Sequence, residues 1–588
     1  MAARTEQDQS FARLIQIGIA LSAERNHARL MERILIEAKD MCNADGGTLY
    51  LRTDDDRLKF EIMRTDSLDI ALGGTTGKEL TFPSIAMYND KTGDPNHRNV
   101  ATYAALTGES VNIADAYETE DFDFSGTKKF DQGTGYRSKS FLTVPMKNHE
   151  GDVIGVLQLL NAQDPETGEV IPFPSDIQPL IEALTSQAAV ALDNQLLLQA
   201  QKELLDSFIE LIASAIDAKS PYTGGHCQRV PELTNMLAKT ACSSTDEPFK
   251  DFDLTEDQWY ELHIAGWLHD CGKVTTPEYV VDKATKLETI YNRIHEIRTR
   301  FEVIKRDAVI DHLKAGGEDE KKLDQELKDR LAQIDDDFEF IAKCNIGGEF
   351  MGPELIERVK QIASIRWQRT IDDRLGISQN EMKRKGKPSK SKLPVSEPLL
   401  GDRADHLIPY DEGEKNRYDE SFGFRLDFPE HKYNQGEVYN LSIARGTLTA
   451  EERFKINDHI MQTISMLEQL PFPKHLARVP EYAGAHHEKM DGTGYPRRIK
   501  KNDMSIPARI MAIADIFEAL TAADRPYKPP KTLNESLRIM SSMKKDHHID
   551  GDLFELFLRS GIYMEYAKKF LKPDQIDEVD IEKYLDGD

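Results

Sequence analysis

The chain of 588 residues is long enough for roughly three or four domains of ordinary size. Its 102 acidic residues against 75 Lys and Arg give a net charge of −27, which argues against DNA, RNA or an anionic membrane as partners held by diffuse charge. Five scattered cysteines with no CxxC pair argue against a disulfide framework and a cysteine zinc site. Because the sequence has no apolar run of membrane-spanning or signal-peptide length, we expect a soluble protein of the cytoplasm.

The first part of the sequence predicts helices around a sheet. Apolar residues recur every three or four positions from Phe11 to Met41, which is the period of an amphipathic helix. The aliphatic stretches 46–53, 140–147 and 152–161 predict strands, and the turn NHEGD between the last two predicts a hairpin.

This order of elements resembles a GAF sensory domain of the cyclic-nucleotide type over residues 11–194. The motifs that carry the resemblance are NIADAY at 112–117, TGYRSKSFLTVPM at 134–146 and GDVIGVLQLLN at 151–161. The resemblance implies an α/β sandwich over residues 1–180, with an antiparallel sheet, helices and a pocket for a cyclic nucleotide or other small ligand. Ala162 replaces a lysine that the family often has after the last strand, so the identity of the ligand stays open.

A long connecting helix is predicted over residues 181–217, because this stretch contains neither Gly nor Pro. Its heptad frame is mostly apolar and comprises Leu184, Ala188, Ala191, Gln195, Leu198, Lys202, Leu205, Ile209, Ile212 and Ile216. Such a helix either pairs with its twin in a homodimer or is buried against its own domain.

Residues 285–432 differ in composition from the sequence on either side. This stretch is highly charged, with an acidic run at 335–337 and a basic run, KRKGKPSKSK, at 383–392. Two charged helical patterns, 285–314 and 318–343, predict an antiparallel helical hairpin. We interpret residues 285–432 as a mostly helical insertion, in which the basic run is either a solvated loop or a docking patch.

Two motifs that follow the connecting helix carry metal-binding chemistry. GAHHEKMDGTGYP, residues 484–496, places two imidazoles and a carboxylate within one turn and continues into a glycine-rich loop. WLHDCGK, residues 267–273, sets His269 beside Asp270 at the end of an apolar helix. An imidazole can bind one ion while the neighbouring carboxylate bridges two, so these motifs predict a site for two metal ions.

Together these motifs resemble the HD-GYP family of metal-dependent phosphodiesterases, a branch of the HD superfamily. Three further stretches match the family in the same order: PYTGGHCQRV at 221–230, LTAEERFKINDHI at 448–460 and RIMAIADIFEALTAADRPYK at 509–528. The resemblance implies an all-α, HD-type helical domain over residues 203–588. With the GAF part, this makes a multidomain α+β protein.

The resemblance also implies which residues act. One ion would be held by His226, His269, Asp270 and Asp515, and the second by Asp270, His459, His486 and His487. Asp270 and Lys273 would be catalytic, and the contacts to substrate would be made by Lys273, Arg525, Lys528 and Tyr495. The family is typically iron-bound, and the same ligand mixture suits manganese as the alternative. Tyr222 stands where some members have a glutamate for a third ion, so we expect a binuclear site.

Some of these assignments have competitors. His295 also follows a run of lysine, leucine and threonine, but it stands eight residues after Leu287, whereas His459 stands eleven after Leu448, as the family pattern requires. Glu488 would either orient a ligating histidine or cap the loop. The residues Asp491, Gly492, Gly494, Tyr495 and Pro496 would shape the substrate mouth, offer a docking surface for diguanylate cyclase domains, or form a rigid turn.

The function implied is hydrolysis of cyclic di-GMP to the linear dinucleotide pGpG, or onward to GMP, under the control of the GAF domain. Two alternatives use the same site. One is hydrolysis of cyclic GMP-AMP, and the other is a catalytically silent receptor that binds a cyclic dinucleotide and acts through protein contacts.

Overall fold

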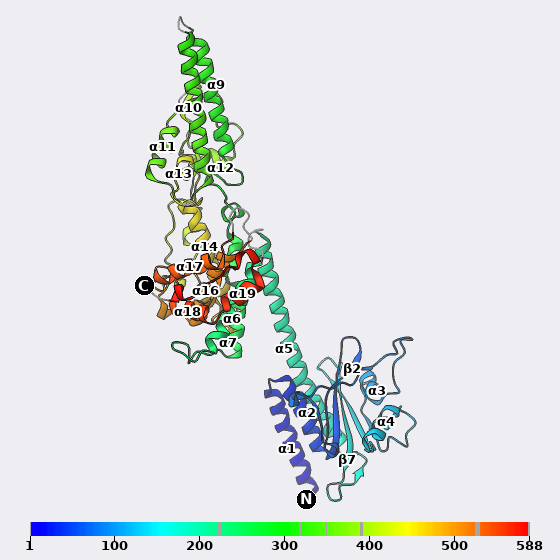
Figure 1. Ribbon diagram of the computed structural model, residues 1–588. Helices are drawn as coiled ribbons and strands as arrows, with labels where there is room; N and C mark the ends of the chain where they lie inside the picture. The colour runs from blue at the N-terminus through cyan, green and yellow to red at the C-terminus, as the bar shows by residue number, and fades with distance from the viewer. Residues whose placement is uncertain are drawn as a thin grey trace. The chain divides into compact units, whose positions relative to one another are not determined.

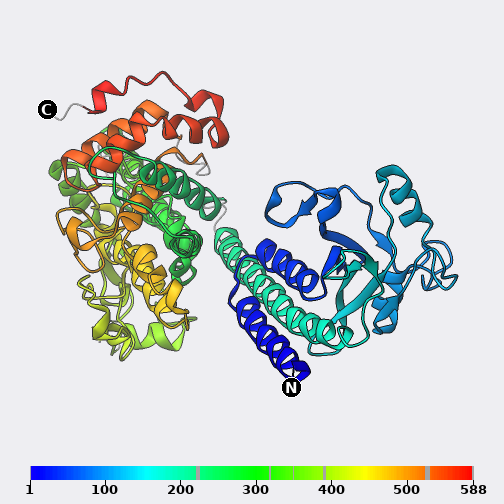
Figure 2. The ribbon, with the colours of Figure 1, turned by 90° about the horizontal axis from the view of Figure 1, so that it is seen from below.

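The computed structural model describes residues 2–219, 225–316, 320–348, 350–387, 392–523 and 530–585. The chain divides into two compact units, Met1–Leu205 and Asp206–Asp588 (Figures 1 and 2). Among the described residues, none of the helices has the length and apolar content needed to span a membrane.

Unit 1 is built on an antiparallel sheet with the strand order β3–β2–β1–β7–β6–β5, to which β4 adds beside β2 and β8 beside β7. The expected hairpin is formed by β6 (Phe141–Lys147) and β7 (Val153–Gln163), in which Val144 lies opposite Leu157. The remaining strands are β1 (Ala44–Arg52), β2 (Arg57–Thr65), β3 (Ile70–Gly73), β4 (Ile85–Ala86), β5 (Val111–Ile113) and β8 (Val170–Ile171).

Helices pack on both faces of this sheet. On one face, α1 (Ala2–Ala23), α2 (His27–Met41) and the first part of α5 (Gln178–Lys219) share a core with Leu49 and Leu157. On the other face, α3 (Val100–Thr107) places Ala104 against Tyr50 and Val156. The residue before α4 (Ser125–Thr134), Phe124, packs with Ile113 of the edge strand β5.

The N-terminal helical pattern belongs to two helices. The periodicity from Phe11 to Met41 predicts continuous helix, but α1 ends at Ala23 and α2 begins at His27. The side chain of Asn26 accepts a hydrogen bond from the backbone N–H of Arg29 at 2.9 Å and so caps the second helix. The spacing of apolar residues does not reveal a break of three residues between two helices. The break is marked instead by a local polar contact, the Asn26 cap.

The heptad frame of α5 serves different purposes along the helix. Leu184 and Ala188 are buried in the core of unit 1, and Ile209 and Ile216 are buried in that of unit 2. Between them the helix is exposed, and Leu198 retains 64% of its accessible surface. The heptad residues at the two ends of α5 are therefore buried by the chain's own domains, whereas those in the middle of the helix remain exposed.

Unit 2 is predominantly helical around one large core that includes Leu262, Tyr482, Phe517 and Phe557. The helices that carry this core are α6 (His226–Cys242), α7 (Glu256–Leu268), α15 (Val479–Gly484), α16 (Ile506–Thr521), α17 (Leu533–Lys545), α18 (Gly551–Arg559), α19 (Ile562–Phe570) and α20 (Glu582–Leu585). Two further helices, α8 (Glu278–Val281) and α14 (Ala450–Glu468), flank it with the short 3-10 helix η3 (Cys271–Thr275).

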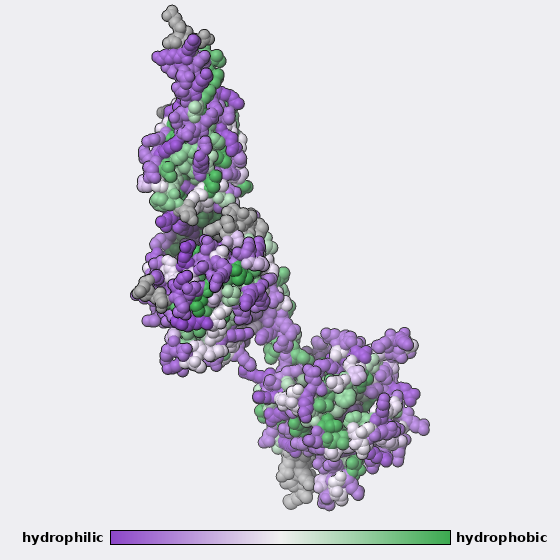
Figure 3. All heavy atoms as spheres, viewed as in Figure 1, coloured by the Kyte–Doolittle hydropathy of each residue, from purple (hydrophilic) through white to green (hydrophobic). Residues whose placement is uncertain are grey.

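The 285–432 segment forms most of a second core in unit 2, with Phe301, Ile341 and Val359 buried together. Its helices α9 (Ile294–Ala315) and α10 (Glu320–Ile346) lie antiparallel, as Lys305 pairs with Asp335 and His312 with Asp324. The face of this hairpin seen in Figure 3 is mostly hydrophilic. The predicted hairpin is confirmed, although its first helix starts at Ile294, where the side chain of Asn292 accepts from the Ile294 N–H at 3.1 Å.

The rest of the segment and its C-terminal neighbours contain short elements. They are α11 (Pro353–Ala363), β9 (Arg366–Arg369), α12 (Gln379–Arg384), β10 (Val395–Pro398), β11 (Leu407–Ile408), β12 (Tyr433–Asn434) and α13 (Glu437–Leu441). The strands form two small antiparallel ladders, β9 with β10 and β11 with β12.

Candidate metal centre

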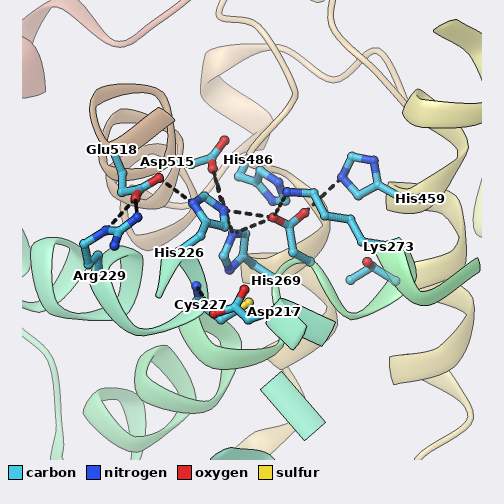
Figure 4. A network of polar contacts seen from close by, with 12 residues as sticks. Asp217, His226, Cys227, Arg229, His269, Lys273, His459, His486, Asp515 and Glu518 are labelled. Carbon is cyan, nitrogen blue, oxygen red and sulfur yellow. Dashed lines mark hydrogen bonds and ion pairs between the residues drawn. The ribbon is translucent and has the colours of Figure 1, made fainter. Parts of the chain in front are cut away.

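Seven side chains from separate stretches of unit 2 gather into two overlapping groups of metal-ligand type. Within each group, one donor atom of every residue lies within 4.8 Å of the others (Figure 4). The first group is His226, His269, Asp270 and Asp515, and the second is Asp270, His459, His486 and His487. These are the two sets that the sequence motifs predict, and the fold brings both together at the meeting point of α6, η3, α14 and α16.

Asp270 belongs to both groups and turns one carboxylate oxygen toward each. Its Oδ2 lies 3.0 Å from His226 Nε2 and 3.1 Å from His269 Nε2. Its Oδ1 lies 3.1 Å from His459 Nε2. A carboxylate in this position has the geometry of a bridge between two cations.

Backbone carbonyls fix the orientation of three of the histidines. The Nδ1–H groups of His269, His459 and His486 donate to carbonyl oxygens three residues earlier, at 2.7, 2.5 and 2.6 Å. A carbonyl can only accept, so Nδ1 carries a proton, and in the neutral imidazole the lone pair is then on Nε2. Each Nε2 is therefore free to bind a metal ion.

Glu518 orients the fourth histidine, and sequence reasoning missed this residue. Its carboxylate accepts from His226 Nδ1 at 2.5 Å and from Arg229 Nε at 2.7 Å (Figure 4). Burial acts against the charged carboxylate, but His226 and Arg229 outweigh it and lower the pKa of Glu518 to about 2. The signal was present in the spacing, because Glu518 follows Asp515 by three residues and so shares its face of α16.

A close approach of backbone to backbone brings His459 to the centre. A Cβ atom on Gly272 would lie 1.9 Å from the carbonyl oxygen of His459 and 2.6 Å from the amide nitrogen of Thr463. Only glycine therefore lets η3, which follows Asp270, pack this closely on α14. The glycine of the His-Asp-Cys-Gly-Lys stretch thus permits the close contact that brings Asp270 and His459 together.

The donor atoms fit divalent transition-metal ions. Asp270 Oδ1 and His486 Nε2 are buried without a hydrogen-bond partner among the described residues. The Nε2 atoms of His226 and His269 are 3.2 Å apart, as are those of His459 and His487. Burial lowers the pKa of His486 to about 4 and that of His487 well below its usual range, so both are neutral and able to ligate. Nitrogen atoms crowded in this way need a metal ion or a proton between them.

Lys273 stands between the donor groups and an adjoining pocket. Its ammonium group pairs with Asp270. Burial opposes the charged carboxylate, but Lys273, His269 and His226 together outweigh it, so that the pKa of Asp270 stays well below its usual range. The pocket is lined by Asp217, Lys219, His226 and Lys273, among others. Of the other predicted contacts, Arg525 and Lys528 lie outside the described residues, as does Tyr222.

The glycine-rich loop after His487 is held from within by Glu488. The Glu488 carboxylate accepts hydrogen bonds from the backbone N–H groups of Arg497, Arg498 and Ile499, at 2.6, 3.1 and 3.1 Å. Of the two roles open to Glu488, these contacts favour capping of the loop. A Cβ atom on Gly494 would lie 2.3 Å from the Lys489 nitrogen, so the loop folds back on itself only with glycine there.

The remaining loop residues divide between the centre and the surface. Tyr495 stacks on His487, with ring centroids 4.9 Å apart and an angle of 20°, and Pro496 is buried. Asp491 is exposed and accepts from the Thr493 N–H at 2.8 Å, while Gly492 adopts a φ of 82° in the turn between them.

His295, the competitor of His459, lies on α9, where it pairs with Arg298.

Comparison with known proteins agrees with both halves of the chain. The model of the GAF domain matches residues 26–192, and that of an HD domain matches residues 394–553. The 3'3'-cGAMP-specific phosphodiesterase 1 of Vibrio cholerae is 44% identical over 83 residues, 14% of this chain and 19% of that protein. The cyclic di-GMP phosphodiesterase of Thermotoga maritima is 39% identical over 114 residues, 19% of this chain and 30% of that protein.

Among solved structures, the GAF domain from an Acinetobacter phosphoenolpyruvate-protein phosphotransferase matches 33% of this chain and 98% of its own, at 14% identity and a TM-score of 0.24. The chain spans less than a third of the length of the two curated relatives. It has a GAF domain in its N-terminal part and an HD domain in its C-terminal part, and its relatives include cyclic dinucleotide phosphodiesterases.

Proposed function

We propose that this chain, which joins a GAF domain to an HD domain, is a cytoplasmic, metal-dependent phosphodiesterase that hydrolyses cyclic di-GMP to pGpG. Residues 1–180 are the sensor, 181–217 the connecting helix and 203–588 the phosphodiesterase, with 285–432 inserted in it. The observation that supports this most strongly is Asp270, whose two oxygens face two separate groups of histidines.

Two divalent ions, iron first and manganese as the alternative, would be held by the two groups around Asp270. When bound, they supply the Lewis acidity that activates water and neutralises charge on a phosphodiester. The protein contributes fixed geometry, because the Nδ1–H of each of His226, His269, His459 and His486 is already bound to a carboxylate or carbonyl.

Lys273 is the residue of this chain best placed to hold the substrate. Its ammonium group lies beside Asp270 and lines the adjoining pocket, with 31% of its side chain exposed. A cation here stabilises the negative charge that builds up on non-bridging phosphate oxygens during in-line attack. Arg525, Lys528 and Tyr495 are proposed to complete the phosphate contacts, with Tyr495 held by its stack on His487.

A second substrate, 3',3'-cyclic GMP-AMP, is favoured by a specific observation. The relative from Vibrio cholerae that is 44% identical over its matched stretch is named for this dinucleotide. Both substrates have the same phosphodiester ring and differ in one base, so the metal groups do not distinguish them.

Product analysis tests the proposal and separates the two substrates. Anaerobic, iron-loaded protein is expected to convert cyclic di-GMP to pGpG, identified by chromatography and mass spectrometry, faster than it opens cyclic GMP-AMP. Tight binding of either dinucleotide without a linear product would instead indicate the silent receptor. The same assay after metal removal by a chelator is the control, and turnover should then disappear.

The end of α5 contacts the centre from two sides and offers a route for regulation by the GAF domain. Asp217 Oδ2 accepts from the backbone N–H of Gly225 and Cys227, at 3.1 and 3.3 Å, on either side of His226. Lys219 Nζ donates to the carbonyl oxygens of Lys273 and Thr276, at 3.3 and 2.7 Å. A ligand that shifts α5 would therefore move the segments that carry His226 and Lys273.

The exposed middle of α5 supports a homodimer. An apolar stripe, here called the α5 stripe, consists of Leu197, Leu198, Leu204, Leu205, Phe208, Leu211 and Ile212. Leu197, Leu204 and Leu211 recur every seven residues, and Leu198, Leu205 and Ile212 repeat one position later. A broad apolar face with this repeat is typical of helices that pair with a copy of themselves.

Charges placed on the α5 stripe are expected to separate the dimer. Leu204→Glu with Leu211→Glu should lower the sedimentation mass from twice 66.7 kDa to 66.7 kDa, because like charges would face each other across the twofold axis. Leu313→Glu on α9 changes a leucine that is even more exposed and should leave the mass unchanged. A wild-type protein that sediments as a monomer would contradict the dimer.

The exposed tip of the glycine-rich loop, at Asp491 and Thr493, is the part of the loop open to a diguanylate cyclase.

A further inference from the structure

The 285–432 segment contacts the catalytic centre through a short stretch, Arg417–Asp427, here called the strap. The strap runs from α14 to the glycine-rich loop. Its first contact is with Asp458, which is fully buried and directly precedes the candidate ligand His459. Arg417 forms an ion pair with Asp458, and Tyr418 Oη donates to the same carboxylate at 2.6 Å.

These contacts hold the turn of α14 that carries His459. Gln462, one turn further along, donates from Nε2 to Tyr418 Oη at 2.6 Å, so Tyr418 bridges two turns of the helix. Apart from the strap, Lys455 Nζ supplies one further contact to Asp458, at 3.1 Å. A buried carboxylate needs such donors, because burial alone opposes its charge. Arg417, Lys455 and Tyr418 together outweigh burial, and the pKa of Asp458 stays below its usual value.

The other end of the strap holds the glycine-rich loop. The backbone N–H of Arg425 donates to the carbonyl oxygen of Pro496 at 2.7 Å, and Arg497 Nε donates to the carbonyl oxygen of Phe422 at 2.8 Å. Arg498 pairs with Asp427 at 3.0 Å. The loop is thus fixed between Glu488 on its inner side and the strap on its outer side, next to the Tyr495 ring that stacks on His487.

Within the part of the chain that the structure describes, the strap therefore touches the surroundings of the second metal group and not those of the first. His459 and His487 belong to the second group only. His459 directly follows Asp458, which the strap binds, and His487 stacks on Tyr495, which lies in the loop that the strap holds. In the first group, His226 is held by Glu518 and His269 by a carbonyl of its own helix. We infer that the strap is a positioning element, supplied by the 285–432 segment, for the second metal group. This inference rests on the proposed function.

Metal titration tests the inference with a readout that does not depend on turnover. With Mn²⁺ as the probe, the wild-type chain is expected to take up two ions. Arg417→Met should weaken one of them by about tenfold to a hundredfold, the usual effect of losing a contact behind a ligand, and leave the other unchanged. Arg417→Lys should restore much of the loss, since it returns the charge to Asp458.

Two comparisons assign the loss to the second group. In a His487→Ala background, which already lacks a second-group ligand, Arg417→Met should have no further effect on the ion that remains. Lys305→Met removes the cation of an exposed pair elsewhere in the same segment and should leave both ions bound with wild-type affinity. Tyr418→Phe deletes a single hydroxyl and provides a milder variant if Arg417→Met does not fold.

The outcomes separate this inference from the proposed function. Two ions bound at wild-type affinity by Arg417→Met and Tyr418→Phe would overturn the inference alone, as would equal weakening of both ions. A wild-type chain that binds no Mn²⁺ would overturn the proposed function and the inference together.

Discussion

Asp270→Asn is expected to release both metal ions and to lower kcat by at least about a thousandfold, which corresponds to about 4 kcal/mol of lost transition-state stabilisation. Asp270 alone contributes to both donor groups, with Oδ2 toward His226 and His269 and Oδ1 toward His459. An amide keeps the size of the side chain, but it loses the charge and replaces one oxygen with an NH₂ group that cannot ligate. Metal content by atomic spectroscopy and turnover on the same preparation check this result.

Three matched variants make the Asp270 result specific. Asp550→Asn changes another fully buried carboxylate of unit 2, which is paired with Arg509 away from the centre, and should keep both ions. His226→Ala should weaken only the ion of the first group, and His486→Ala only that of the second. If Asp270→Asn retains wild-type metal content and activity, the assignment of Asp270 as a bridging ligand is wrong.

Glu518→Gln should weaken the metal ion of the first group by about tenfold to a hundredfold and lower activity in proportion. Glu518 is buried and ionised, and it accepts from His226 Nδ1 at 2.5 Å. The charge behind the imidazole keeps the proton on Nδ1 and increases electron density at Nε2, the atom that faces Asp270. Glutamine keeps one acceptor oxygen but loses that charge, and it leaves the Arg229 guanidinium without its carboxylate.

Glu261→Gln is the control for Glu518. Glu261 is also buried in unit 2, and it accepts from the backbone N–H of Arg478 at 2.8 Å without contacting the donor groups. Its substitution should change thermal stability at most and leave metal content intact. Wild-type metal affinity in Glu518→Gln, measured by competition with a chelator, would show that Glu518 has only a structural role.

Local motifs, with the family resemblance that they carry, were sufficient to predict both domains and the two groups of side chains that the structure brings together. Two aliphatic stretches joined by the turn NHEGD located the β6–β7 hairpin, since strand propensity and turn residues are local signals. Asp270, His269, His486 and His487 lie in short motifs whose residue types are those that metal ions prefer. The spacing from Leu448 singled out His459 over His295, and the structure places His459 at the centre and His295 on α9.

Those motifs could not predict contacts between distant parts of the chain. Glu518 orients His226 from 292 residues away, and the strap reaches Asp458 from within a segment that composition marks only as charged. Neither contact has a sequence signature, because a hydrogen bond requires only that two groups meet with the right geometry, whichever elements carry them.

The sequence by itself determined that this is a GAF domain followed by an HD domain, and it predicted two groups of side chains of metal-ligand type. It did so because helix periods, aliphatic strand stretches and short motifs are properties of neighbouring residues. The tertiary structure alone decided which oxygen of Asp270 serves which group, what holds each histidine, and how the 285–432 segment contacts the second group. These depend on how separate helices pack, which is settled by the burial of all their side chains together.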